Sequence, residues 1–224
     1  MRKLIIWTVI AMLLTASSAL AARGKSSGGA APTQSSLTLA WSHGTYDYGE
    51  PVTPATDYIA TQGGFPEMGL NLEYAKMMAQ DYQMAVGFDY RWGSYKSEPT
   101  TNAVAGSPTV KITSSSWKLR VGGDRVGEIG SRFKWFFGPG IEYSNGKGKF
   151  ENVVAAGTVD GPSTSKWGLN GRVGGVMMLN PTMGIKGQVG DSFGMASVSD
   201  TGGKDTWYYS TFEAMWGLEW TFGK

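Results

Sequence analysis

Charged residues that recur at every second position are the first candidates for chemistry in this sequence. Positions of opposite parity carry Trp, Tyr and aliphatic residues, so on strands the charged side chains would share one face. The nine residues expected to form a lumen charge network are Glu73, Asp89, Arg91, Arg120, Arg132, Glu142, Arg172, Lys186 and Glu219. Four further residues share that parity, namely Glu67, Lys118, Lys134 and Glu213.

Three kinds of chemistry fit such a set. Acids and bases in a narrow, dry interior must pair, because an unpaired buried charge is very costly, and the result is a packed plug of ion pairs. The same charges could line a narrow ion path. Two carboxylates could also act as the acid and base of a glycosidase, although no cleft is indicated. We expect the plug, with a structural role.

His43 is the only histidine, and it shares its outward parity with Trp41 and Thr45. A histidine and a hydroxyl that face the outer leaflet are features of enzymes that modify lipid A. Such a reaction also needs a carboxylate to orient the imidazole and a donor for the oxyanion. Because no acid stands at a suitable spacing, we expect an interfacial histidine and no catalytic residue.

The sequence lacks the residues that several classes of functional site require. Cysteine is absent, which excludes disulfides and thiolate metal sites. No glycine-rich run continues as a phosphate-binding loop. The net charge of +2, without a basic cluster among aromatic residues, argues against a nucleic-acid partner. We expect neither a cofactor nor a metal.

Eight segments show the alternation of period two that predicts strands. The clearest are residues 84–93 and 207–222, the latter through its part 214–222, and the others are 37–42, 67–76, 110–121, 132–143, 167–173 and 183–189. Val110 and Ile112 have the opposite parity to Trp117, which a bulge or a position above the membrane would explain. Residues 46–66, 97–108, 144–165 and 200–204 are expected as loops, and residues 79–82, 122–130 and 180–181 as short turns.

These features predict an all-β fold, an eight-stranded antiparallel up-and-down transmembrane β-barrel. Long and short connections alternate, as in bacterial barrels whose short turns and chain ends face the periplasm. The aromatic faces would then meet lipid, and tryptophans favour the lipid–water interfaces. The expected girdle consists of Trp41, Trp92, Trp117, Trp135, Trp167, Trp216 and Trp220.

The N-terminus predicts export. A basic start, a short apolar run and an Ala-rich ending indicate a signal peptide over residues 1–22. Residues 23–35 are rich in Gly and Ser and are expected as a flexible periplasmic lead-in, and residues 36–224 as the barrel domain.

The aromatic, Gly-rich segment 133–143 and the closing segment 216–222 resemble the small outer-membrane β-barrel family, which includes OmpX, Ail, opacity-type proteins and the OmpA barrel domain. The resemblance implies a Gram-negative outer-membrane protein whose partners are outer-membrane lipids, lipopolysaccharide and the barrel-assembly machinery. We expect a monomer with a structural or adhesive role and an extracellular ligand at its loops. A channel for small or hydrophobic solutes is the alternative, followed by a lipid A-modifying enzyme.

Overall fold

The protein is described by a computed structural model that covers residues 34–48, 67–97, 110–152, 157–200 and 203–223. The predicted signal peptide, most of the lead-in and the loop positions near Asp57 and Ser107 lie outside these ranges.

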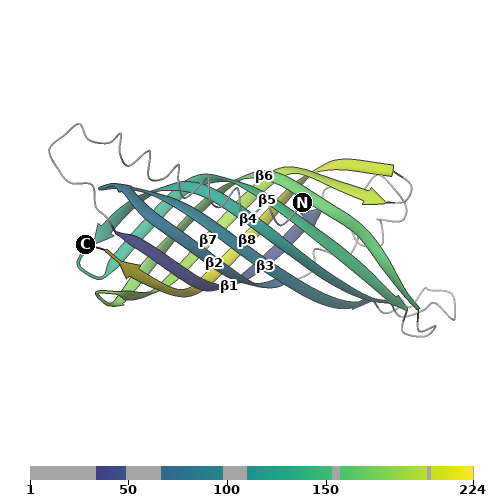
Figure 1. The fold of residues 1–224 in the computed structure, drawn as a ribbon, viewed down its shortest axis with the longest axis horizontal. Helices are drawn as coiled ribbons and strands as arrows, with labels where there is room; N and C mark the ends of the chain where they lie inside the picture. Colours follow the sequence, from purple (N-terminus) through teal and green to yellow (C-terminus); the bar gives the residue numbers. More distant parts are fainter. Residues whose placement is uncertain (1–33, 49–66, 98–109, 153–156, 201–202, 224) are drawn as a thin grey trace.

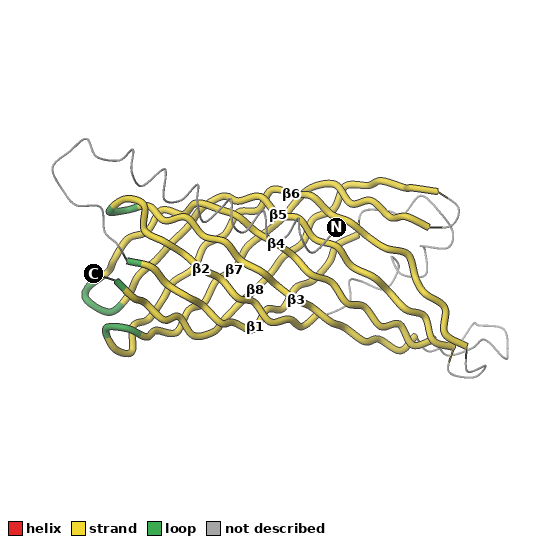
Figure 2. The backbone as a smooth tube through the Cα atoms, viewed as in Figure 1, coloured by secondary structure: helices red, strands yellow, loops and turns green. Residues whose placement is uncertain are grey.

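Eight strands close into one antiparallel barrel, in which each strand pairs with the next and β1 pairs with β8 (Figures 1 and 2). The strands are β1 (Ser35–Tyr48), β2 (Glu67–Ala79), β3 (Tyr82–Ser97), β4 (Val110–Ile129), β5 (Phe133–Asn152), β6 (Gly157–Asn180), β7 (Met183–Asp200) and β8 (Gly203–Phe222). The predicted fold class is confirmed. No helix in the described ranges is both long enough and apolar enough to cross a membrane.

The alternation places apolar side chains outside and charged ones inside. On β3, Phe88 is 45% exposed and Tyr90 47%, whereas their neighbours Asp89 and Arg91 are each 2% exposed. A water-soluble barrel would show the reverse, because it would bury its apolar face. An apolar belt around a polar interior is the pattern that lipid selects.

The strands are strongly tilted. Following paired residues once around the wall from Trp135 leads through Trp216 and Trp41 back to β5 at Asn145, a stagger of ten residues. A barrel closes only with such a stagger, which tilts strands by roughly 35–45°. With eight strands, the interior is just wide enough for packed side chains.

Several strands are longer than the sequence pattern predicted. The segment 122–130, expected as a turn, belongs mostly to β4, and the chain reverses at residues 130–132 with Gly130 at φ 65°. The expected loop 144–165 is largely formed by the ends of β5 and β6 that the predicted topology places outside the cell, called the outer ends. Their sequence consists mostly of Ser, Thr, Gly, Asn and Lys, so it lacks the hydrophobic alternation that reveals a strand. The bulge considered for β4 is absent from its described pairing with β3, which runs without a shift from Val110 to Arg125.

Backbone hydrogen bonds tie together the rim that carries Gln34 and the β2–β3, β4–β5 and β6–β7 turns. It is called the periplasmic rim here because the predicted topology places the short turns in the periplasm. The carbonyls of Gln34, Asp81, Arg132 and Thr182 accept from the amides of Met77, Val126, Met178 and Thr221, at 2.7–2.9 Å. Gln34 immediately precedes β1, and the other three acceptors lie in turns between strands. Each accepts from a residue on the next strand but one or on the strand that neighbours its own. This pattern satisfies polar backbone groups at an edge that the strand ladder leaves open.

Gly217 is a point where the wall admits no side chain. A Cβ there would collide with the Leu39 carbonyl and with Ala40, both backbone neighbours on β1. Gly217→Ala should therefore cost about 1–3 kcal/mol of unfolding free energy through overpacking at the β1–β8 seam. Gly187→Ala, where a Cβ meets open space, should change it by less than about 0.5 kcal/mol. Urea unfolding in vesicles measures both, and equal costs would contradict this packing.

Candidate functional site: the charged lumen

Charged side chains from seven of the eight strands meet inside the barrel. They are Glu73 on β2, Asp89 and Arg91 on β3, Lys118, Arg120 and Asp124 on β4, Glu142 on β5, Arg172 on β6, Lys186 on β7, and Glu213 and Glu219 on β8. Period-two alternation explains their common direction, because each lies on the inward parity of its strand. They form two adjoining groups along the barrel axis.

The first group is centred on Glu73, which is 2% exposed. Its carboxylate contacts three cations: Lys186 at 2.7 Å, Arg120 at 3.4 Å, and Arg172 in a close ion pair. Lys186 also contacts Glu219 at 3.3 Å, and Glu219 accepts a hydrogen bond from Thr38. One acid thus holds together cations from β4, β6 and β7.

Asp124 completes this Glu73 group. Its carboxylate is fully buried and accepts from Arg172 Nε at 2.9 Å and from Gln83 Nε2 at 3.1 Å. Three carboxylates then face three cations, so the Glu73 group is neutral overall. Sequence reasoning missed Asp124 because it assigned this segment to a turn, although strand parity continued from Arg120 would have placed it inward.

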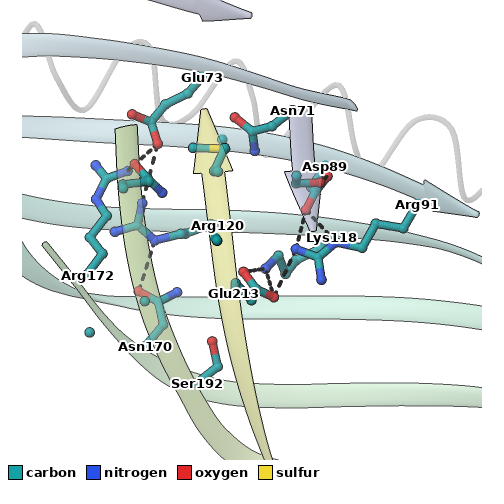
Figure 3. Close-up of a pocket in the computed structure, with 17 residues that line it drawn as sticks. Asn71, Glu73, Asp89, Arg91, Lys118, Arg120, Asn170, Arg172, Ser192 and Glu213 are labelled. Carbon is teal, nitrogen blue, oxygen red and sulfur yellow. Dashed lines mark hydrogen bonds and ion pairs between the residues drawn. The ribbon is translucent and has the colours of Figure 1, made fainter. Parts of the chain in front are cut away.

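The second group is centred on Glu213, which lies nearer the outer end of β8 than Glu219 does. Figure 3 shows Glu213 with Arg91, Lys118 and Asp89. Glu213 binds Arg91 at 3.0 Å and forms a close ion pair with Lys118. Arg91 also binds Asp89 at 2.6 Å, and Asp89 accepts a hydrogen bond from Ser42 at 2.8 Å. Like Glu73, Glu213 is shared between cations from different elements.

Asn170 joins the two groups. Its amide oxygen accepts from Arg120 Nε at 2.9 Å, and its amide nitrogen donates to Glu142 at 3.2 Å. Glu142 also accepts from Ser192 and Tyr209 and lies 3.7 Å from Lys118. The lumen therefore contains one continuous polar network, which crosses the barrel between opposite walls.

Phe136 stacks against this network from within the lumen. Its ring centre lies 4.7 Å from Lys186 Nζ and 5.2 Å from Arg172 Cζ, at distances typical of cation–π contacts. The residue is 2% exposed. Phe136 is absent from the predicted lumen residues, although its parity with Lys134 indicates the inward direction.

Two described cavities border the network. One of about 40 Å³ lies between the Glu73 and Glu213 groups, and one of about 390 Å³ opens among residues of the periplasmic end, including Glu128, Lys134 and Thr221. Asn71 Oδ1 and Arg120 Nη2 are buried without a hydrogen-bond partner, and both residues line the smaller cavity. That cavity has room for about three water molecules, which could bond these atoms.

Eight of the nine predicted network residues lie in this network, and Arg132 does not. Arg132 is exposed in the turn that follows Gly130, so its predicted inward direction is wrong. The chain reverses there, and strand parity no longer applies. Of the four further residues, Lys118 and Glu213 join the network. Lys134 contacts Gln34 at the periplasmic mouth, and the Glu67 side chain lies outside the described part.

The predicted tryptophans occupy the outer surface. Trp117, Tyr143 and Trp167 form a chain of ring contacts at 5.3 and 4.5 Å across β4, β5 and β6. Trp92 continues this side and meets Trp41 edge-on at 5.7 Å. Trp135 and Trp220 lie close to the opposite, periplasmic strand ends, and Trp216 pairs with Trp41 across the β1–β8 seam.

His43 is exposed on the outer wall, with Met68 and Ala214 as its cross-strand neighbours. Neither neighbour supplies a carboxylate. The described residues include no group of three or more His, Cys, Asp or Glu that could hold a metal ion.

Neither a protein-family model nor a curated protein matches this chain. Solved structures do match it. Ail, the attachment invasion locus protein of Yersinia pestis, aligns with a TM-score of 0.50 and 14% identity over 85% of this chain and 99% of Ail. The outer membrane protein OprG from Pseudomonas aeruginosa aligns with a TM-score of 0.51 and 13% identity over 87% of this chain and 98% of OprG.

The chain has the fold of the small outer-membrane β-barrels. The resemblance of segments 133–143 and 216–222 is thus confirmed at the level of the fold, and the fold supports a location in the outer membrane. At these identities the likeness concerns the fold alone. The function of this barrel is therefore inferred below from its own lumen network and outer wall.

Proposed function

We propose that this barrel is a non-enzymatic surface protein that uses the outer ends of its strands for binding. The observation that carries the proposal is the length of β4, β5 and β6 beyond the Trp117–Tyr143–Trp167 contacts. They continue for seven, nine and ten residues, over 110–116, 144–152 and 157–166. At about 3.3 Å per residue, these ends continue for roughly 23–33 Å, measured along the tilted strands, beyond the aromatic residues that favour the interface.

The exposed side chains that the structure describes at the ends of β4 and β5 are polar. Ser115, Lys147, Lys149 and Glu151 are exposed, and Lys111 forms an exposed ion pair with Glu151 at 3.7 Å. A polar sheet that projects from the membrane suits recognition of a partner outside the cell. We place lipids and lipopolysaccharide against the apolar belt, and the assembly machinery as a partner during insertion only.

The orientation can be tested because the chain contains no cysteine. Lys149→Cys should react with a membrane-impermeant maleimide on intact cells, because we place it outside the outer leaflet. Asp81→Cys, in the exposed β2–β3 turn, should react only after the outer membrane is permeabilised. The opposite labelling pattern would invert the proposed topology.

Adhesion tests the function itself. Ail has been solved in complex with the heparin analogue sucrose octasulfate, so immobilised heparin is a suitable first probe alongside host-cell surfaces. Cells that display the barrel should adhere more than cells without it, and Lys147→Glu with Lys149→Glu should reduce adhesion to heparin. Asp81→Lys, at the other end, should have no effect. Equal adhesion with and without the barrel on every surface would refute a binding role.

A channel is the second candidate function, and the cavity of about 390 Å³ at the periplasmic end favours it. For transport, this cavity would have to continue through the network that Glu73 and Glu213 hold together. Liposome swelling in small sugars and amino acids checks this directly. We expect vesicles with the barrel to swell no faster than empty vesicles.

A further inference from the structure

Two titratable side chains stand in the outer wall among apolar ones. His43 on β1 has Met68 and Ala214 as cross-strand neighbours. Asp191 on β7 has Gly171 and Phe212, and its carboxylate accepts a hydrogen bond from Ser210 at 3.3 Å. Both side chains are exposed, which in a membrane means that they face lipid or a partner. Ionisable groups on the lipid face are destabilising unless something pairs with them.

His43 and Asp191 lie at the same height along the barrel axis. Val189, Ala214 and His43 are partners in one line across β7, β8 and β1. This line climbs toward the outer end by ten residues per eight strands, or about 1.25 residues per strand. His43 is therefore about 2.5 residues above Val189, and Asp191 is two residues above it on β7.

Because His43 and Asp191 lie at the same height, this wall can pair with a second copy of itself. In place of the monomer expected from the sequence, we infer that the face formed by β7, β8 and β1 is an interface between two copies of this chain, related by a two-fold axis along the membrane normal. Such an axis preserves height and exchanges the two sides of β8. His43 then meets Asp191 of the partner subunit, and the reciprocal pair forms on the other side of the axis.

The shape of β8 fits an axis near Ala214. This small residue lies between the protruding Phe212 and Trp216, which are 54% and 65% exposed. Small residues let two backbones approach closely in a membrane, where packing and hydrogen bonds replace the hydrophobic driving force. Phe212 and Trp216 would pack against the second copy above and below the contact. The second copy supplies the ionisable partner that each of the two lipid-facing groups lacks among its cross-strand neighbours.

Cross-linking at the axis tests the interface, since the natural chain has no thiol. Ala214→Cys should form a disulfide-linked dimer in outer membranes under mild oxidation. Ile141→Cys is the matched control, because it is 55% exposed to lipid on β5, away from the proposed interface. The control should form few dimers. Equal cross-linking of both variants, or none of Ala214→Cys, would overturn the interface.

A charge exchange tests the pairing. Asp191→Asn should lower the association constant in bilayers about tenfold, because both reciprocal contacts lose the Asp191 carboxylate. His43→Asp combined with Asp191→His exchanges the partners and should restore association, whereas His43→Asp alone should not. Single-molecule photobleaching in vesicles measures the dimer fraction. Unchanged association in Asp191→Asn, or failure of the double variant to recover, would refute the pairing.

Discussion

Replacing Glu73 by Gln should destabilise the folded barrel by about 3–5 kcal/mol, the usual cost of removing one partner from a buried ion pair. Gln preserves the shape but removes the charge that Arg120, Arg172 and Lys186 share. Asp124 and Glu219 would then face three cations without their central acid. Urea unfolding in lipid vesicles, followed by tryptophan fluorescence, measures the loss.

Glu128→Gln is the matched control for the Glu73 substitution. Its side chain is 65% exposed and lies 4.0 Å from Lys134 at the periplasmic rim. Exposed pairs contribute little, so this change should cost less than about 1 kcal/mol. If the two variants unfolded at the same urea concentration, the Glu73 carboxylate would not be holding the network together.

Phe88→Arg should destabilise the barrel by about 2–4 kcal/mol, because the new charge would face hydrocarbon from the middle of β3. Phe88 pairs with Leu72 and Leu119, so apolar side chains surround it on both sides. The same unfolding experiment measures this loss.

Gly87→Ser changes the adjacent residue on the opposite face. A Cβ at Gly87 meets Glu73 and Asn71 at 3.6–3.8 Å, which is ordinary contact distance. The added hydroxyl would enter a polar lumen, so the cost should be well below that of Phe88→Arg. An Arg variant as stable as the parent would show that the two faces of β3 are assigned the wrong way round.

Period-two alternation was sufficient to predict the eight strands and the direction of most side chains. On β3, every second residue from Met84 to Trp92 faces lipid, and Asp89 and Arg91 face the lumen as expected. The prediction succeeded there because lipid and lumen are chemically opposite environments, which makes parity visible in the residue types.

The predictions failed where lipid-facing and lumen-facing residues do not differ in chemical type. The outer ends of β5 and β6 consist mostly of polar residues and Gly, so their sequence resembles that of loops. Asp124 sits among Gly and charged residues near the rim, and Arg132 lies beyond the reversal at Gly130. Phe136 obeys strand parity but departs from the expected residue types, because an aromatic side chain occupies an inward position and packs against cations.

The sequence also could not predict which charged residues of the network contact one another. Parity states that Glu73 and Arg172 both point inward, but it does not state that they meet across the barrel. Their contact depends on strand order, stagger and the closed wall. Asn170 shows the same dependence, because its role as a link requires Arg120 on one side and Glu142 on the other.

Single-channel recording in planar bilayers tests most directly whether this paired network closes the lumen. The paired charges predict a flat baseline without steady openings for the natural protein, because ions would have to separate buried pairs to pass. Steady openings whose ion selectivity shifts in Arg120→Glu would contradict the closed lumen and would establish a conducting path through the Glu73 and Glu213 groups.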